Sequence, residues 1–193
     1  MLVTDDALLD GRDLVALVRA AEQGGITSVQ LRLKRSTAAD LAHLGRALLL
    51  TVGIPLIIND RIDVALAIGA HGVHLGPDDV PVALARRIAP PGFVIGASVG
   101  LETELENGSM ADYWGIGPWS QTTTKRGAGQ ALGATGFQYI AAHAGTRPCI
   151  AIGGIQPENV AAALAAGAAG VAIVSGILGA YDVTAAARRY CAL

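Results

Sequence analysis

Two cations and an amide alternate with apolar residues at the end of one β-branched stretch. Gln30, Arg32 and Lys34 are spaced two residues apart, and a β-strand places residues with this spacing on one face. Polar side chains that face a protein interior need partners, and guanidinium and ammonium groups bind phosphate or carboxylate. The stretch therefore predicts an anion site, while a solvated strand end is the alternative.

Carboxylates follow the next two apolar stretches. Asp60 comes directly after one of them, and the pair Asp78-Asp79 follows the other. Asp60 together with Asp78 or Asp79 has the chemistry to hold Mg²⁺, which takes one or two carboxylates plus phosphate oxygens and waters. The same residues would also serve as helix caps. His74 fits a core histidine as well as a functional one, and no Cys/His grouping indicates zinc.

Three further segments have the composition of phosphate sites. The loop at 117–127 carries hydroxyls and cations, which suit a pyrophosphate, although a mobile surface loop is the alternative. The pairs Gly153-Gly154 and Ser175-Gly176 follow two later apolar stretches. Backbone amides at such positions form the phosphate-binding corner of many parallel barrels.

Eight apolar stretches alternate with helical patterns along the chain. The predicted strands are 2–4, 26–31, 55–58, 72–75, 93–96, 113–116, 149–152 and 170–174. The predicted helices are 13–23, 38–51, 62–68, 82–88, 101–106, 136–143, 157–166 and 185–190. The alternation predicts an α/β fold, a (βα)8 TIM barrel with short loops that forms a single domain over residues 1–193, with its site where the strands end. An open doubly wound sheet is the alternative, but no GxGxxG follows the first strand.

A weak internal repeat supports the strand-and-helix alternation. Residues 69–76 resemble residues 167–174, and residues 108–115 form a looser third copy. Each copy begins with a glycine that can end a helix in the left-handed region before the next strand. Thr37 with Asp40 predicts a capped start for the helix at 38–51.

Composition and charge limit the kinds of partner and the cellular compartment that can be expected. The net charge is −2 and charged residues are only 16%, so no basic field is present to bind nucleic acid or an anionic membrane. The apolar stretch at 160–181 is mostly Ala and Gly, which argues against a membrane helix. Cys149 and Cys191 lack metal or disulfide spacing and no signal-peptide pattern is seen, so a cytoplasmic protein is expected. A homo-oligomer is compatible with the sequence.

Motifs spread over nearly the whole chain resemble those of the thiamine-phosphate synthase family in order and spacing. They are Val29-Gln30-Leu31-Arg32-x-Lys34, Ile57-Ile58-Asn59-Asp60-Arg61, Gly72-Val73-His74-Leu75-Gly76, Gly117-Pro118 with Thr122-x-Thr124-Lys125, Ile152-Gly153-Gly154-Ile155 and Val174-Ser175-Gly176. The resemblance implies a (βα)8 enzyme that joins a hydroxymethylpyrimidine pyrophosphate to a thiazole phosphate and releases pyrophosphate with Mg²⁺. Its partners would be these small phosphorylated substrates.

The resemblance also implies roles for particular residues. The diphosphate ligands would be Arg32, Lys34, Asn59, Thr122, Thr124 and Lys125, the Mg²⁺ ligands Asp60 and Asp79, the pyrimidine contacts Gln30 and Ser98, and the thiazole phosphate ligands Gly154 and Ser175. The neighbouring amides of Gly153 and Gly176 are expected to complete the thiazole phosphate site, because backbone amides bind anions without a cation. Lys125, Arg32 and Ser98 are the expected catalytic residues.

The chain departs from the family pattern at two positions near the expected site. Pro77 stands where the family often has Gln, and Gly100 stands where it often has His. The related thiazole tautomerase relies on that His and does not need the metal aspartates, so the synthase is favoured. A tautomerase-like enzyme and a non-catalytic phosphate-ligand binding protein of the same fold are the alternatives.

Overall fold

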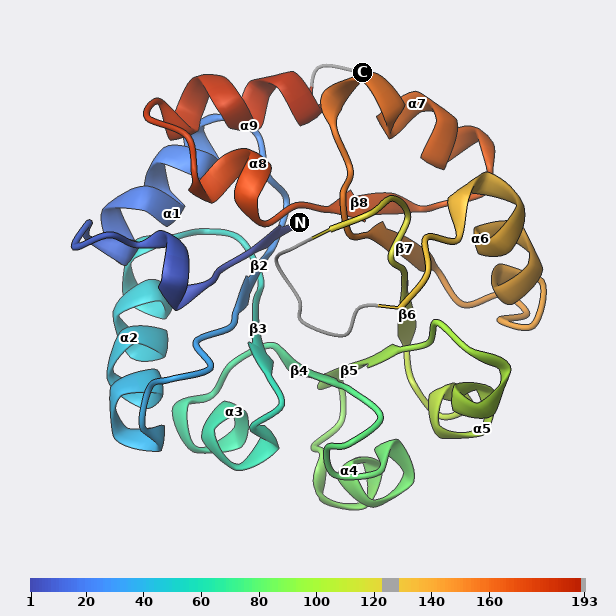
Figure 1. Ribbon diagram of the computed structural model, residues 1–193. Helices are drawn as coiled ribbons and strands as arrows, with labels where there is room; N and C mark the ends of the chain where they lie inside the picture. Colours follow the sequence, from blue (N-terminus) through green and yellow to red (C-terminus); the bar gives the residue numbers. More distant parts are fainter. Residues whose placement is uncertain (123–128, 192–193) are drawn as a thin grey trace. The chain divides into compact units, whose positions relative to one another are not determined.

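The computed structural model describes residues 1–122 and 129–191 (Figure 1). Its eight strands form one sheet in the order β1 to β8, the same order in which they occur along the chain. The strands are β1 (Leu2–Val3), β2 (Val29–Leu31), β3 (Leu56–Asn59), β4 (Gly72–Leu75), β5 (Val94–Ser98), β6 (Tyr113–Ile116), β7 (Cys149–Ile152) and β8 (Gly170–Ala172). Sequential neighbours in a parallel sheet need crossover connections, which the helices supply.

Helices follow the strands in turn. The α-helices are α1 (Leu14–Gln23), α2 (Ala38–Thr51), α3 (Ile62–Ile68), α4 (Val82–Ile88), α5 (Leu105–Gly108), α6 (Gly133–Ala141), α7 (Pro157–Ala165), α8 (Ser175–Leu178) and α9 (Val183–Cys191). Two 3₁₀ turns, η1 (Asp6–Leu8) and η2 (Glu102–Glu104), precede α1 and α5. No helix among the described residues is long and apolar enough to cross a membrane.

The sheet returns to its first strand. Ile173, directly after β8, pairs in parallel with Leu2 of β1, and the Val3 amide donates to the Ile173 carbonyl at 2.9 Å. An open doubly wound sheet has no such pairing, so that alternative is wrong. The fold is a (βα)8 barrel, as the alternation of strands and helices predicts.

The chain comprises two compact units. Unit 1 contains residues 1–73 and 173–193, and unit 2 contains residues 74–172. In unit 1, α1 packs against α2 and α9, and α2 packs against α3 and β3 (Figure 1). In unit 2, α4 packs against β5, α6 against β6 and α7 against β8. The organisation as one domain over residues 1–193 stays a prediction.

The sequence patterns locate most elements, and the misses are at short ones. The bounds of α2, α3, α4, β4, β6 and β7 are as predicted. Thr37 and Asp40 form the predicted capping box. The pattern at 101–106 becomes the two short turns η2 and α5, while η1 and α8 were not predicted. Turns of three or four residues bury too few side chains to show a helical period.

One glycine of the internal repeat has a different role from the one predicted. Gly69 and Gly167 have φ of 70° and 95°, as the left-handed prediction requires. Gly108 instead is the last residue of α5 and ends no helix in the left-handed region. Its carbonyl accepts a hydrogen bond from Trp114 Nε1 at 2.8 Å, and a Cβ there would lie 2.7 Å from that nitrogen. Residue 108 is small because an indole packs against it.

Candidate active site

In unit 1, the end of β2 is fixed to the end of β1 by a buried hydroxyl. The Thr4 side chain is fully buried. Its Oγ1 accepts from the Arg32 amide at 2.9 Å and donates to the Arg32 carbonyl at 3.1 Å. This two-way bond holds the backbone of Arg32 just beyond the strand.

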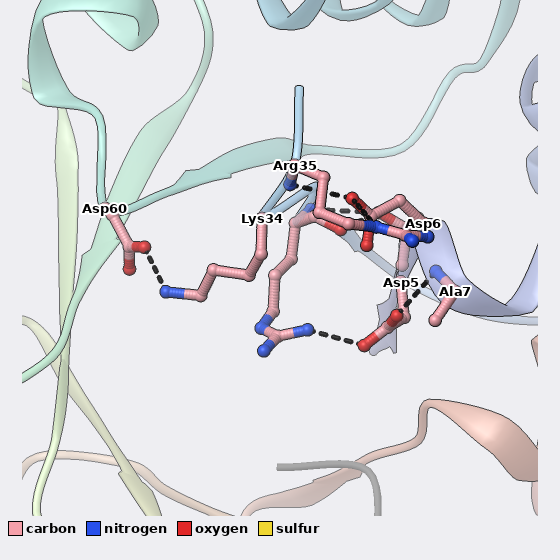
Figure 2. A network of polar contacts seen from close by, with 8 residues as sticks. Asp5, Asp6, Ala7, Lys34, Arg35 and Asp60 are labelled. Atoms are coloured by element: carbon pink, nitrogen blue, oxygen red, sulfur yellow. Dashed lines mark hydrogen bonds and ion pairs between the residues drawn. The ribbon is translucent and has the colours of Figure 1, made fainter. Parts of the chain in front are cut away.

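Three cations after β2 are each paired with a carboxylate (Figure 2). Arg32 Nη1 lies 2.6 Å from Asp5 Oδ2, and Lys34 Nζ lies 2.5 Å from Asp60 Oδ2. The Arg32 side chain is 18% exposed and that of Lys34 is 52% exposed. The third pair is Arg35 with Asp6. We call these six residues the ion-pair cluster.

Asp5 and Asp6 were missed by the sequence reasoning, although they follow the first strand as the other candidates follow theirs. Asp5 is buried, and its second oxygen accepts from the Ala7 amide at 2.9 Å, which caps η1. Asp6 accepts from both the amide and the side chain of Arg35. Inspecting strand one by the rule applied to the other strands would have found both residues.

Asp60 does not cap the helix that follows it. The N-cap of α3 is Arg61, which makes no side-chain capping bond, and Arg61 pairs with Asp63, whose pKa its guanidinium lowers. Asp60 has a left-handed φ of 65°, which is uncommon for a residue with a side chain. The capping alternative is therefore wrong for Asp60, whose carboxylate binds Lys34 instead. Asn59, the last residue of β3, accepts from the Arg61 amide through its carbonyl.

Asp79, in unit 2, is not a helix cap either. The N-cap of α4 is Pro81, with no side-chain capping bond. Asp79 Oδ2 accepts from the Gly76 amide at 2.7 Å and so closes the turn after β4. Asp78 is exposed, whereas Asp79 is half-buried. Of the two, Asp79 is the residue whose carboxylate closes the turn.

A second polar group in unit 2 is buried and forms hydrogen bonds to two hydroxyls. His74 is 8% exposed. Its Nδ1 lies 2.9 Å from Tyr113 Oη, and its Nε2 lies 3.0 Å from Oγ of Ser98, the last residue of β5. We call these three residues the Tyr113–His74–Ser98 network. His74 is thus part of a polar network, and Tyr113 was missed because its strand reads as an apolar run.

Two glycines make room for this network. A Cβ at Gly96 would overlap the ring of Tyr113, and a Cβ at Gly115 would lie 3.0 Å from Cε1 of His74. Both glycines have ordinary strand conformations, so the space they leave explains their identity better than backbone freedom does.

The glycine pair after β7 contacts the first part of the loop at 117–127. Gly153 and Gly154 have φ of 92° and 66°. The Ser120 amide donates to the Gly153 carbonyl at 2.9 Å, and a Cβ at Gly154 would lie 2.6 Å from the carbonyl oxygen of Gln121. Thr122 is described as part of this loop, while Thr124 and Lys125 lie outside the described residues.

The other small pair, in unit 1, begins a helix. Ser175 is the first residue of α8, so its amide and that of Gly176 lack acceptors within the helix. A Cβ at Gly176 would overlap the Tyr190 hydroxyl. Arg12 holds the far end of α8, donating to the carbonyls of Leu178 at 2.6 Å and Ala180 at 2.9 Å.

Gly100, which departs from the family pattern, lies where the structure leaves no space for a side chain. A Cβ at residue 100 would lie 2.6 Å from the Gly117 carbonyl oxygen. A histidine at this position would displace the chain after β6.

Gln30, on β2, is buried as expected, with Nε2 4.0 Å from Met1 Sδ.

A (βα)8 fold with cations, carboxylates and glycines following its strands defines a class of barrel enzymes that bind phosphorylated substrates. The family model described as thiamine monophosphate synthase matches residues 1–177. The chain belongs to this family. Its function is thiamine-phosphate synthesis, and it is a transferase.

Similar proteins agree with the family. A thiamine-phosphate synthase of Azorhizobium caulinodans is 47% identical over 97% of this chain and 90% of its own length. One of Moorella thermoacetica is 44% identical over 93% of this chain and 87% of its own. The solved structure of a thiamine phosphate pyrophosphorylase from Pyrococcus furiosus matches with a TM-score of 0.84 at 35% identity, over 98% of this chain and 92% of that one.

Proposed function

We propose that the chain joins 4-amino-5-hydroxymethyl-2-methylpyrimidine pyrophosphate to 4-methyl-5-(2-phosphoethyl)thiazole, forming thiamine phosphate and pyrophosphate. The observation that carries the proposal to individual residues is the ion-pair cluster. Within this cluster, Arg32 and Lys34 follow β2 and Asp60 follows the neighbouring β3, all in one compact unit. These are the groups that a diphosphate and its metal ion require.

In unit 1, Arg32, Lys34 and Asn59 bind the diphosphate in this proposal. Arg32 suits a forked contact to phosphate oxygens, and Lys34 acts as a point charge. Both cations already bind carboxylate oxygens. Their N–H groups are therefore held in place to bind the oxygens of an anionic ligand. Thr122, Thr124 and Lys125 in unit 2 are the further proposed ligands, of which only Thr122 lies in the described structure.

Mg²⁺ is the proposed cofactor, with Asp60 and Asp79 as its protein ligands. The described residues include no group of three or more His, Cys, Asp or Glu that could enclose a metal. That fits an ion that takes few protein ligands and completes its shell with phosphate oxygens and water. When bound, Mg²⁺ would neutralise charge on the departing pyrophosphate.

The remaining predicted residues contact the two heterocyclic substrates. Gln30 and Ser98 are proposed to bind the pyrimidine. The amides of Gly153 and Gly154 in unit 2, and of Ser175 and Gly176 in unit 1, are proposed to bind the thiazole phosphate. Amide donors hold an anion without a cation, and the sequence has no Lys or Arg between Arg147 and Arg188.

The proposed reaction begins with ionisation of the pyrimidine diphosphate. The bond from the exocyclic carbon to oxygen breaks, the pyrophosphate leaves with the electron pair, and the thiazole nitrogen then attacks the carbon. The amino group stabilises the cation by donating electrons into the ring. Arg32 and Lys34 stabilise the charge that builds on the leaving group.

No protein nucleophile is needed in this scheme. Ser98 does lie beside His74, but the group that hydrogen-bonds His74 Nδ1 is the Tyr113 phenol, whereas in a serine hydrolase a carboxylate occupies that position. Burial raises the pKa of the Cys149 thiol, which disfavours its thiolate. A pyrimidine adduct on either residue, detected by mass spectrometry, would contradict the scheme.

We also propose a cytoplasmic location, small phosphorylated substrates as the partners, and no binding of nucleic acid or membranes. Both cysteines are free in the described structure, which suits a reducing compartment. A homo-oligomer is compatible with the proposal. Gel filtration coupled to light scattering measures the oligomeric state.

Steady-state turnover with both substrates and Mg²⁺ tests the proposed function. The expected result is stoichiometric thiamine phosphate and pyrophosphate, lost when either substrate is omitted. Tautomerisation of the thiazole without coupling would support the tautomerase-like alternative. Binding of both ligands without turnover would support the non-catalytic alternative.

A further inference from the structure

The Tyr113–His74–Ser98 network ends at a residue of the proposed site. Ser98 is the last residue of β5 and is half-buried, whereas His74 and Tyr113 are buried. The two hydrogen bonds of His74, at 2.9 and 3.0 Å, use both ring nitrogens. A neutral imidazole donates from one nitrogen and accepts at the other. Whether the Ser98 hydroxyl donates to His74 or accepts from it therefore depends on the hydrogen bond between His74 and the Tyr113 phenol.

The packing fixes this network in place. Gly96 and Gly115 leave room for the rings of Tyr113 and His74, which lie 5.5 Å apart between centroids. Side chains held this closely keep one rotamer. Both ring nitrogens of His74 are engaged in hydrogen bonds, and these favour the ring orientation that faces Ser98.

We propose that Tyr113 is a positioning residue that acts on the pyrimidine through His74 and Ser98. Tyr113 Oη accepts from His74 Nδ1–H, His74 Nε2 accepts the hydroxyl hydrogen of Ser98, and Ser98 Oγ offers a lone pair to the exocyclic amino group of the substrate. This inference rests on the proposed function, because it takes an aminopyrimidine as the ligand of Ser98.

The direction of the hydrogen bonds follows from the substrate's chemistry. The amino group gives electron density to the ring as the carbon–oxygen bond breaks, so its N–H groups become stronger donors. An oxygen acceptor at Ser98 then binds the transition state better than the ground state. A chain of neutral bonds running to Tyr113 polarises in the same sense and strengthens this acceptor.

Tyr113→Phe is the direct test, since it removes one oxygen and keeps the ring. We expect kcat to fall about tenfold, the effect of one lost buried hydrogen bond, with the KM for the thiazole phosphate unchanged. Tyr181→Phe is the matched control because that side chain is fully exposed, and we expect it to keep wild-type kinetics.

A spectroscopic readout separates positioning from packing. ¹⁵N NMR of His74 in the wild type should show the proton on Nδ1, and Tyr113→Phe should reduce the Nδ1–H population in a protein that circular dichroism shows to be folded. A wild-type kcat in Tyr113→Phe, or a proton on Nε2 in the wild-type protein, would overturn the proposal. Should wild type make no thiamine phosphate, the proposed function fails, and the substrate part of this inference fails with it. The NMR comparison would then still decide whether Tyr113 sets the histidine's tautomer.

Discussion

The ion-pair cluster in unit 1 and the Tyr113–His74–Ser98 network in unit 2 both consist of polar side chains, but they differ in charge and in burial. The cluster pairs full charges, and its Lys34 is half-exposed. The network joins His74 to two hydroxyls, and its two rings are buried beside two strand glycines. An exposed ion pair contributes little stability, so Lys34 can exchange Asp60 for a ligand, whereas a buried neutral network resists rearrangement.

This difference indicates a division of labour within the proposed site. In the proposed function, the cluster would provide charges that exchange carboxylates for a diphosphate and a metal ion. The network would provide one oriented hydroxyl for an uncharged heterocycle. The two regions should therefore respond differently to substitution and to salt.

The largest effect is expected when the cluster loses the carboxylate assigned to the metal. Asp60→Asn should lower kcat by about 10²–10³, the usual cost of removing one group that stabilises transition-state charge. The assay is steady-state turnover across a Mg²⁺ titration. Asp63→Asn is the control, because Asp63 pairs with Arg61 outside the cluster. Near wild-type turnover in Asp60→Asn would remove Asp60 from the metal assignment.

In the network, adding one methyl group should disrupt the packing. Gly96→Ala places a Cβ against the Tyr113 ring and should lower the free energy of unfolding by about 1–3 kcal/mol, as overpacked cores do. Chemical denaturation measures this change. Gly170→Ala, whose Cβ would meet only Ile150 Cδ1 at 3.7 Å, should cost much less. Equal stabilities for the two variants would mean that the ring moves freely.

These two regions also show what the sequence can and cannot predict. The spacing of Gln30, Arg32 and Lys34 is local and predicts an anion site at a strand end. The partner of Arg32 is Asp5, 27 residues earlier, and only the pairing of β1 with β2 brings them together. Such a contact depends on register, which no single stretch encodes.

Tyr113 was hidden for a related reason. Its strand reads as a buried apolar run, so its hydroxyl carried no signal. The hydroxyl matters because Gly96, its partner in the register of β5 and β6, leaves space for the ring. The barrel itself was predictable because eight strand and helix periods are local features. Thr124 and Lys125 lie outside the described residues, so their roles stay predictions.

A smaller effect is expected when Arg32 loses its counter-charge. Asp5→Asn keeps an oxygen for the Ala7 amide but removes the ion pair that orients Arg32. We expect the KM for the pyrimidine diphosphate to rise about fivefold, equivalent to about 1 kcal/mol, with kcat little changed. Asp6→Asn is the control, since its partner Arg35 is not a proposed ligand. Circular dichroism checks that both variants are folded. Equal KM values for the pyrimidine diphosphate in the two folded variants would contradict the role of Asp5.

The smallest effect concerns salt. Raising the ionic strength from about 0.1 M to about 1 M shortens the Debye length from about 10 Å to about 3 Å, so the KM for the pyrimidine diphosphate should rise a few-fold. The NMR signals of His74 should not change, because its hydrogen bonds to Tyr113 and Ser98 are to neutral hydroxyls. Salt-dependent His74 signals would show that the two regions are not electrically independent.

Calorimetry of inorganic pyrophosphate with Mg²⁺ tests the central claim most directly, because pyrophosphate carries the charge of the substrate without its heterocycle. Arg32→Met should weaken pyrophosphate binding by about tenfold or more, as expected for a lost charged hydrogen bond. Tyr113→Phe should bind pyrophosphate as tightly as the wild type does. Equal losses in the two variants, or a loss confined to Tyr113→Phe, would contradict the assignment of the diphosphate to the ion-pair cluster and of the heterocycle to the network.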